Sequence, residues 1–329
     1  MKNQSAKRKL RSALRWIGWV LVVQFILITI SAAFYAYKYS YFYNDPTAQT
    51  HFANENIFQK TWRLFTGPKF SKAANYESPA FPYKDVTLTT QSGLHIKGWM
   101  ANTDSVAKGT VILFHGLSQN KAEKLSEANE FLYWGYNIFM IDFRAHGNSE
   151  GHVSTSGYRE AEEVKLAIDY VRQQNKLPVF LWGSSMGAVA ILKAIDDYHL
   201  KPSGIIIELP FTSLQSLIRA RLRANGFSGL PEKPFAFLIT FWTGIERGIK
   251  AFHFNTIKYA KQVNCPVLMQ SGAHDHIVSP INAQKIFKNI ASQNKKWVVY
   301  PLAAHESLLR KNTAKWREEV AGFLQAYTH

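Results

Sequence analysis

The sequence contains one cysteine, few acidic residues and only one long uncharged apolar run. Because Cys265 is alone, no intramolecular disulfide can form. Its position before Pro266, at the start of an expected strand, indicates a small buried side chain rather than a nucleophile. The sequence shows no internal repeat. It also lacks zinc-ligand spacings, an RNA-binding sheet motif and a basic recognition helix, and these absences argue against nucleic-acid binding. The 329 residues are 47% hydrophobic, which is enough for the core of one large α/β domain.

The apolar run lies near the N-terminus and follows a basic segment. Residues 1–38 hold seven Lys or Arg and no acidic residue, within a chain of net charge +16. Residues 16–37 carry no charge and approach the ~20 residues that cross a bilayer as a helix. By the positive-inside rule, the tail 1–15 is expected in the cytoplasm and the rest of the chain outside it. An aromatic belt is expected at the membrane interface, formed by Tyr35, Tyr37, Tyr39, Tyr41, Phe42 and Tyr43.

A cleaved signal peptide is the alternative interpretation of this segment. Small residues at 31–33 (Ser-Ala-Ala) resemble a cleavage site, but the apolar run continues past them, which favours an uncleaved single-pass anchor. The exported part has no Asn-x-Ser/Thr site, and the single match, at Asn3, is in the cytoplasmic tail. This distribution favours a bacterial inner membrane.

A connector at 38–84 separates the anchor from the main domain. Phe58, Trp62 and Phe65 fall on one helical face, which predicts a short amphipathic helix. Such a helix could lie on the membrane or pack against the main domain, and we favour packing on the domain.

From residue 85 onward the pattern is regular. Val86–Thr90 and Leu94–Met100 are joined around Ser92-Gly93 and predict a hairpin. Buried strands are predicted at Thr110–Phe114, Asn137–Ile141, Val179–Trp182, Ile205–Glu208, Val267–Gln270 and Trp297–Tyr300. Helices are predicted at about Lys121–Trp134, Tyr158–Gln174, Met186–Tyr198, Asn282–Ile290 and Thr313–Ala326. The alternation indicates a domain at 85–329 built on an eight-stranded, mostly parallel sheet with helices on both faces, interrupted by a helical cap at 211–262.

A strand, sharp turn and helix surround residues 183–187, whose sequence is Gly-Ser-Ser-Met-Gly. The turn requires glycine two residues on either side of its central serine, because the backbone there packs too closely for a Cβ atom. This geometry would hold the Ser185 hydroxyl at the carboxyl edge of the sheet, so Ser185 is the predicted nucleophile. The flanking Ser184 is interpreted as packing.

A serine nucleophile needs a base and a carboxylate that orients the base. In this architecture the acid and then the histidine follow the serine in the chain. His305 lies in the loop after the last strand, and Asp275 is the one carboxylate in the loop after the penultimate strand, so we assign these as base and acid. His274 and His276 flank the acid and are interpreted as loop packing, because successive side chains point apart and no further ligand cluster supports a metal site.

Two backbone amides are expected to stabilise the oxyanion. One belongs to Met186, the residue after the nucleophile, and the other to Leu117 in the loop after the first parallel strand. Gly116 permits the tight path of that loop. His115 beside it is interpreted as a structural hydrogen-bonding group rather than a catalytic one.

These motifs resemble, in their order, those of the α/β-hydrolase superfamily, and specifically its membrane-anchored branch of BEM46-like and acylglycerol-lipase-like proteins. The resemblance covers about residues 83–327. It implies an α/β-hydrolase fold and esterase, lipase, thioesterase or peptidase activity without a cofactor. Ala145 departs from the family's usual glycine in the turn 142–149, which is expected to affect local geometry only. The motifs that carry the resemblance are Phe114-His115-Gly116, the segment 142–149, the segment 183–187, Gly272…Asp275…Val278 and His305.

The cap would determine which substrate is bound, since fold alone does not set function. Its basic residues outnumber Glu232 and Glu246, which suits an anionic membrane surface or an acyl substrate with an acidic head. The alternative is a solvated cap whose aromatic residues pack on the domain. The basic residues are Arg219, Arg221, Arg223, Lys233, Arg247, Lys250, Lys258 and Lys261. The aromatic residues are Phe227, Phe235, Phe237, Phe241, Trp242, Phe252 and Phe254.

The sequence therefore predicts a membrane-anchored serine hydrolase that cleaves a lipid-like ester or a thioester through Ser185, His305 and Asp275. A peptidase with the same three residues is one alternative, because such a triad serves ester and amide alike. A binding protein that kept the fold without the chemistry is the other, and the filled triad positions argue against it.

Overall fold

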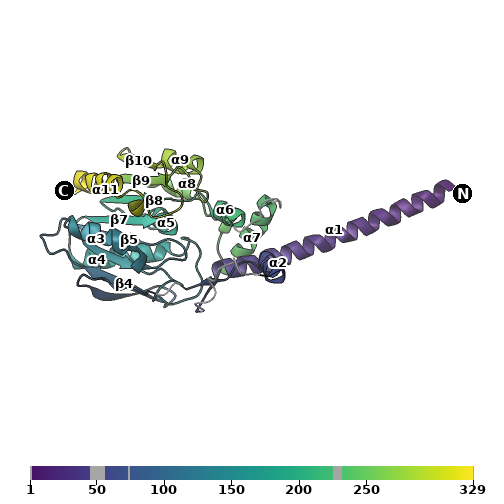
Figure 1. The fold of residues 1–329 in the computed structure, drawn as a ribbon, viewed down its shortest axis with the longest axis horizontal. Coiled ribbons are helices and arrows are strands. Elements are labelled where there is room, and N and C mark those ends of the chain that lie inside the picture. Colours follow the sequence, from purple (N-terminus) through teal and green to yellow (C-terminus); the bar gives the residue numbers. More distant parts are fainter. Residues whose placement is uncertain (1, 45–55, 73–74, 225–231, 329) are drawn as a thin grey trace.

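The computed structural model describes residues 2–44, 56–72, 75–224 and 232–328. An α/β body holds most of the chain, and one long helix projects from it (Figure 1). Phe227, predicted among the cap aromatics, lies outside the described residues.

The body is built on one eight-stranded sheet with the order β10-β9-β8-β7-β5-β6-β4-β3. β3 pairs antiparallel with β4 and β4 antiparallel with β6, and all other pairs are parallel. The predicted hairpin and buried strands are therefore confirmed. The strands are β3 (Lys84–Thr89), β4 (His95–Ala101), β5 (Thr110–Phe114), β6 (Asn137–Ile141), β7 (Val179–Ser184), β8 (Gly204–Glu208), β9 (Val267–Gly272) and β10 (Lys295–Tyr300).

The central strands are buried along their whole length and mostly apolar, because both faces of the sheet are covered. On β5, Ile112 packs into one core cluster and its neighbours Val111 and Leu113 into the other. Helices α4 (Ala161–Gln174), α5 (Met186–Tyr198) and α9 (Pro280–Asn289) cover the first face. The second face is covered by η3 (Lys121–Lys124), α3 (Leu125–Tyr133), α10 (Leu308–Lys311) and α11 (Thr313–Tyr327).

The interval predicted as the cap is helical. It contains α6 (Leu214–Ala224), α7 (Glu232–Arg247), η4 (Ala251–His253) and α8 (Thr256–Ala260). α6 packs against α7, and α7 packs against the end of the N-terminal helix α1 (Lys2–Ser40). The cap thus lies between the sheet and the projecting helix (Figure 1).

The last turns of α1 belong to the body of the protein, which corrects the predicted aromatic belt. Tyr35, Tyr39 and Phe42 are buried rather than placed at an interface. The ring of Tyr35 meets Phe235 of α7 edge-on at 5.9 Å, and the Arg247 guanidinium donates to the Ser40 hydroxyl at 2.7 Å. The sequence could not reveal this, because the partner helix lies about two hundred residues further along the chain.

The predicted amphipathic helix is present as α2 (Ile57–Thr66), but its expected packing on the domain is wrong. α2 packs against α1, and its apolar face is open, with Phe58 82% and Trp62 64% exposed. A capping box at Asn56 fixes the start of the helix. After α2 the chain forms β2 (Phe70–Ser71), which pairs with β1 (Phe42–Tyr43) in a small parallel sheet that the sequence did not predict.

Among the described residues, α1 is the one helix long and apolar enough to cross a membrane by length and composition. Its side chains are exposed from Leu10 to Ile30, with few exceptions, and become buried on one side from Ser31 onward.

Candidate active site

Ser185 occupies the sharp turn between β7 and α5. Its φ of 50° lies in the left-handed region that a non-glycine residue rarely adopts. The two glycines of the motif make the turn possible. A Cβ atom on Gly187 would lie 2.3 Å from the Phe114 carbonyl oxygen, and one on Gly183 would lie 2.7 Å from the Gly187 carbonyl carbon. The close packing therefore holds a strained serine at the carboxyl edge of the sheet.

The structure brings the three predicted triad residues together. His305 Nε2 lies 3.0 Å from the Ser185 hydroxyl, and His305 Nδ1 lies 2.8 Å from Asp275 Oδ2. The acid loop and the histidine loop are joined by a hydrogen bond from the His274 amide to the Ala303 carbonyl. Three separate segments of chain, after β7, β9 and β10, thus meet at one edge of the sheet.

Asp275 is held in one orientation. Its Oδ1 accepts hydrogen bonds from the amides of Ile277 and Val278, each at 2.8 Å, which leaves Oδ2 for the imidazole. The carboxylate is buried, whereas the His305 side chain is about one-fifth exposed. An acceptor at Nδ1 selects the tautomer with its proton on that nitrogen, so Nε2 is free to accept the proton of Ser185.

The amides of Leu117 and Met186 face no acceptor within the described part of the chain. Met186 begins α5, where the first amides of a helix lack intrahelical partners. Leu117 lines the same cavity as Ser185. The residues beside it are fixed: the Gly116 amide donates to Gln119 Oε1 at 3.0 Å, and the Ser118 amide donates to His146 Nε2 at 3.2 Å.

Two buried histidines brace this loop rather than facing the cavity. His115 Nδ1 donates to the Gly116 carbonyl at 2.7 Å, and its Nε2 accepts from the Phe143 amide at 3.0 Å. His146 Nδ1 donates to the Arg144 carbonyl at 2.8 Å. Burial holds the pKa of His115 well below its usual value and also lowers that of His146, so both rings are neutral. Their hydrogen bonds agree with the structural interpretation of the sequence.

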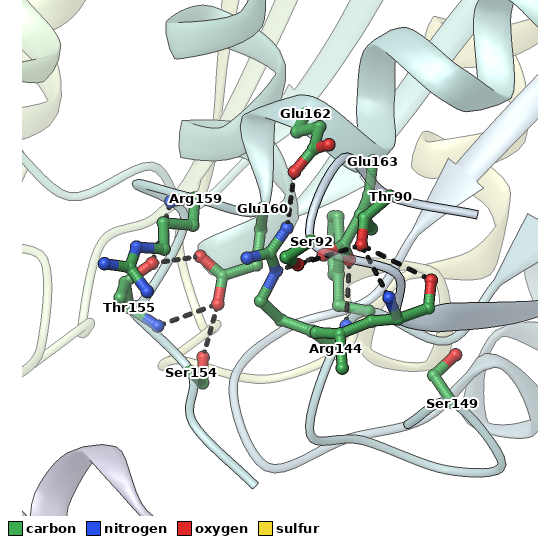
Figure 2. A network of polar contacts seen from close by, with 12 residues as sticks. Thr90, Ser92, Arg144, Ser149, Ser154, Thr155, Arg159, Glu160, Glu162 and Glu163 are labelled. Carbon is green, nitrogen blue, oxygen red and sulfur yellow. Dashed lines mark hydrogen bonds and ion pairs between the residues drawn. The ribbon is translucent and has the colours of Figure 1, made fainter. Parts of the chain in front are cut away.

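The turn at 142–149 is supported by buried ion pairs (Figure 2). Arg144 binds Glu163 through its backbone amide and its guanidinium, and binds Glu162 at 2.9 Å. Desolvation raises the pKa of Glu163, and the Arg144 guanidinium beside it acts in the opposite direction. Ala145 has a φ of 63°, in the region where glycine is favoured, so the departure from the family's glycine puts a residue with a Cβ atom in a strained backbone conformation.

A cavity of about 290 Å³ is lined by Ser185 and by polar side chains that sequence reasoning missed. Glu208 at the end of β8 accepts from the indoles of Trp182 and Trp316 at 3.1 and 2.7 Å, and desolvation raises its pKa to about 7. Glu127 Oε1 accepts from Ser307 at 3.0 Å, while its buried Oε2 has no partner among the described residues. No local motif marks these residues, because they come from separate elements.

Three further interpretations of the sequence need correction or comment. Ser184 lines the cavity with an unpartnered hydroxyl in the described structure, so it is not merely packing. His274 and His276 are exposed and do not pack within their loop. Cys265 is largely buried, and burial raises the pKa of its thiol to about 12, as expected for an inert residue.

The sheet order, the strained serine turn and the loop positions of the acid and the histidine define an α/β-hydrolase. Residues 105–233 and 249–312, more than half of the chain, match the serine aminopeptidase (S33) family, and the chain belongs to it.

Related sequences and structures agree with this assignment. The chain is 25% identical over 237 residues to an uncharacterised membrane protein of Saccharomyces cerevisiae, covering 71% of this chain and 77% of the relative. It is 23% identical over 286 residues to the protein bem46 of Schizosaccharomyces pombe, covering 85% and 84%. An esterase structure from Pyrococcus furiosus aligns with a TM-score of 0.66 and 24% identity, covering 78% of this chain and 97% of that one. The protein is therefore a hydrolase of the α/β superfamily.

Proposed function

We propose that this hydrolase is a membrane-anchored serine esterase whose catalytic residues are Ser185, His305 and Asp275. The observation that carries the proposal is a continuous chain of hydrogen bonds through the three side chains. His305 Nε2 lies 3.0 Å from Ser185 Oγ, and His305 Nδ1 lies 2.8 Å from Asp275 Oδ2. A relay of this length is within the reach required for proton transfer. The substrate is a carboxylic ester of lipid-like character or a thioester.

The reaction follows from the positions of these groups. Ser185 Oγ attacks the acyl carbonyl carbon while its proton moves to His305 Nε2, and Asp275 stabilises the imidazolium that forms. The amides of Leu117 and Met186 donate to the oxyanion of the tetrahedral intermediate. His305 then protonates the leaving alcohol or thiol, and the acyl group remains on Ser185. Water attacks this acyl-enzyme with His305 as base, which releases the acid. This chemistry requires no cofactor or metal.

Membrane anchoring is the second part of the proposal. Helix α1 exposes an apolar surface from Trp16 to Ile30, which is unfavourable in water and favourable in a bilayer. By the positive-inside rule, the basic tail before α1 supports an N-terminus in the cytoplasm and a hydrolase domain outside it, in a bacterial inner membrane.

An aminopeptidase activity at the same residues is the second candidate. The buried Glu127 carboxylate lines the cavity, and one of its oxygens has no partner in the described structure. Glu208 lines the same cavity. Such carboxylates could accept the ammonium group of a peptide N-terminus. Lys124 and Arg221 border the same cavity and disfavour a cationic substrate, so the esterase takes precedence.

The two activities are separated by assaying the detergent-solubilised full chain on p-nitrophenyl esters of increasing acyl length and on aminoacyl p-nitroanilides. We expect ester turnover that Ser185→Ala abolishes and that the control Ser105→Ala retains, because Ser105 is exposed in the loop before β5. Turnover of the anilides with inert esters would establish the aminopeptidase instead. Ester turnover that survives in Ser185→Ala would refute the assigned nucleophile.

A further inference from the structure

The part of α1 that exposes apolar side chains on all sides is shorter than the hydrocarbon core of a bilayer. From Trp16 to Ile30 it has about 15 residues, or roughly 22 Å at 1.5 Å per residue, whereas the hydrocarbon core is about 30 Å thick. From Ser31 onward, one side of α1 is buried through Ala32, Tyr35 and Ala36, while Phe34 and Tyr37 stay exposed on the other side. Over the remaining roughly 8 Å, the elements packed on the buried side of α1 take its place at the surface.

Two elements clamp that base. On one side, the Ser31 hydroxyl donates to the Phe65 carbonyl of α2, and a Cβ atom on Gly67 would lie 2.9 Å from the Tyr35 ring, so the chain after α2 lies directly on α1. On the other side, α7 packs along α1, and Arg247 donates to the Tyr37 carbonyl at 3.0 Å. Figure 1 shows α2 and α7 where the free part of α1 leaves the body of the molecule.

Both elements leave an apolar stripe uncovered. On α2 the exposed residues are Ile57, Phe58 and Trp62, which border an apolar groove with Phe65. On α7 they are Phe237, Phe241 and Ile245, spaced four residues apart along one helix face. The rings of Phe237 and Phe252 are tilted against each other with their centroids 4.8 Å apart, and Phe252 is itself exposed. Contiguous exposed apolar surface of this kind marks an interaction site.

We propose that these stripes form a membrane seat, defined as the exposed apolar residues of α2 and α7 with Phe252, which rests in the outer leaflet around the base of α1. The proposal rests on the proposed membrane anchoring but is independent of the catalytic assignment. The seat continues the apolar surface of α1 through the part of the hydrocarbon core in which one side of α1 is buried against the protein. α6 packs on α7 and brings Arg221 to the catalytic cavity, so one helix pair links the seat to the site.

Charges around the seat fit an anionic lipid surface. Lys69 follows α2, and Lys233 and Lys250 lie on and after α7, all three exposed. The acidic residues of α7 offer little free negative charge at the surface: Glu232 binds Arg219 and Arg223, and the Glu246 side chain is 19% exposed and lies 3.9 Å from Arg247. Basic side chains beside an inserted apolar face strengthen binding to anionic lipids.

The seat can be tested in the full-length protein by site-directed spin labelling. The single native cysteine is removed as Cys265→Ala, and labels are placed by Phe58→Cys and Phe241→Cys. Val22→Cys on α1 serves as the lipid reference and Tyr133→Cys, 87% exposed on α3, as the aqueous reference. The protein is reconstituted in vesicles of equal parts phosphatidylethanolamine and phosphatidylglycerol, and collision rates with oxygen and with a water-soluble nickel complex are compared.

We expect the oxygen-to-nickel collision ratio at positions 58 and 241 to be several-fold above that at position 133 and below that at position 22. Ratios at 58 and 241 equal to that at 133, with a lipid-like ratio at 22, would overturn the seat while the anchor stands. A water-like ratio at position 22 would overturn both the anchor and the seat. Dipolar broadening of the spectrum at position 58 or 241 would show that labels on two copies of the chain lie close together. The exposed apolar residues would then bind a second copy of this chain instead of the membrane, which would overturn the proposal. A circular-dichroism spectrum and a thermal unfolding midpoint equal to those of the Cys265→Ala protein show that the fold of each labelled protein is intact.

Discussion

Replacing Asp275 by asparagine tests the orientation of the base without changing the shape of the site. Asp275 Oδ1 accepts from two amides, those of Ile277 and Val278, at 2.8 Å each. In Asp275→Asn the amide oxygen must take that place, because an NH₂ group there would face two N–H donors. The NH₂ group then points at His305 Nδ1, which must become an acceptor. The proton moves to Nε2, where it blocks the transfer from Ser185.

The expected loss follows from this wrong tautomer. A triad in which the histidine carries its proton toward the serine loses about ten-thousand-fold in kcat, or about 5 kcal/mol of transition-state stabilisation. KM should change little, because Asp275 is buried and does not line the catalytic cavity. Steady-state kinetics on the best p-nitrophenyl ester measure both constants, and thermal unfolding checks the fold. Activity within tenfold of the wild type would refute the orienting role of Asp275.

Three further predictions concern stability. Desolvation raises the pKa of Glu208 from its usual value to about 7, so the folded protein binds this proton more tightly than the unfolded chain does. The free energy of unfolding therefore falls as pH rises from about 4.5 to about 7, by about 3 kcal/mol in total. Glu208→Gln should flatten this dependence and be the more stable protein at pH 8 in chemical unfolding. An unchanged slope would show that Glu208 is ionised when folded. Gly187→Ala places a Cβ atom 2.3 Å from the Phe114 carbonyl oxygen and should yield little folded protein, whereas well-folded, active Gly187→Ala would contradict the packing of the turn. Arg144→Met leaves the buried Glu163 without its partner and should lower the free energy of unfolding by about 3–5 kcal/mol. A change below about 1 kcal/mol would contradict the stabilising role of this pair.

The sheet and the candidate site were predictable because their signals are local. Each buried strand is a short apolar run with turn residues at its ends, and the turn at Ser185 needs glycines at fixed positions. Order along the chain then pointed to the loops that hold Asp275 and His305. The structure places these two side chains within hydrogen-bonding distance of each other and of the serine.

The parts that escaped prediction depend on contacts between distant segments. Tyr35 and Tyr39 have the composition of an interfacial belt, and only the packing of α7 against α1 shows that they are buried. The amphipathic pattern of α2 was correct, but periodicity cannot say which way an apolar face points when the neighbouring helix itself is apolar. The polar lining of the cavity, which includes Glu127 and Ser184, comes from separate elements, so no local sequence motif marks it.

The central claim is that His305 activates Ser185 as a nucleophile. The most direct measurement is reaction of the detergent-solubilised full chain with a fluorophosphonate, followed by peptide mass spectrometry. We predict an adduct on Ser185 that is lost in Ser185→Ala and in His305→Ala and retained in Ser105→Ala. A folded wild-type protein that forms no adduct, or an adduct that persists in Ser185→Ala, would contradict the account.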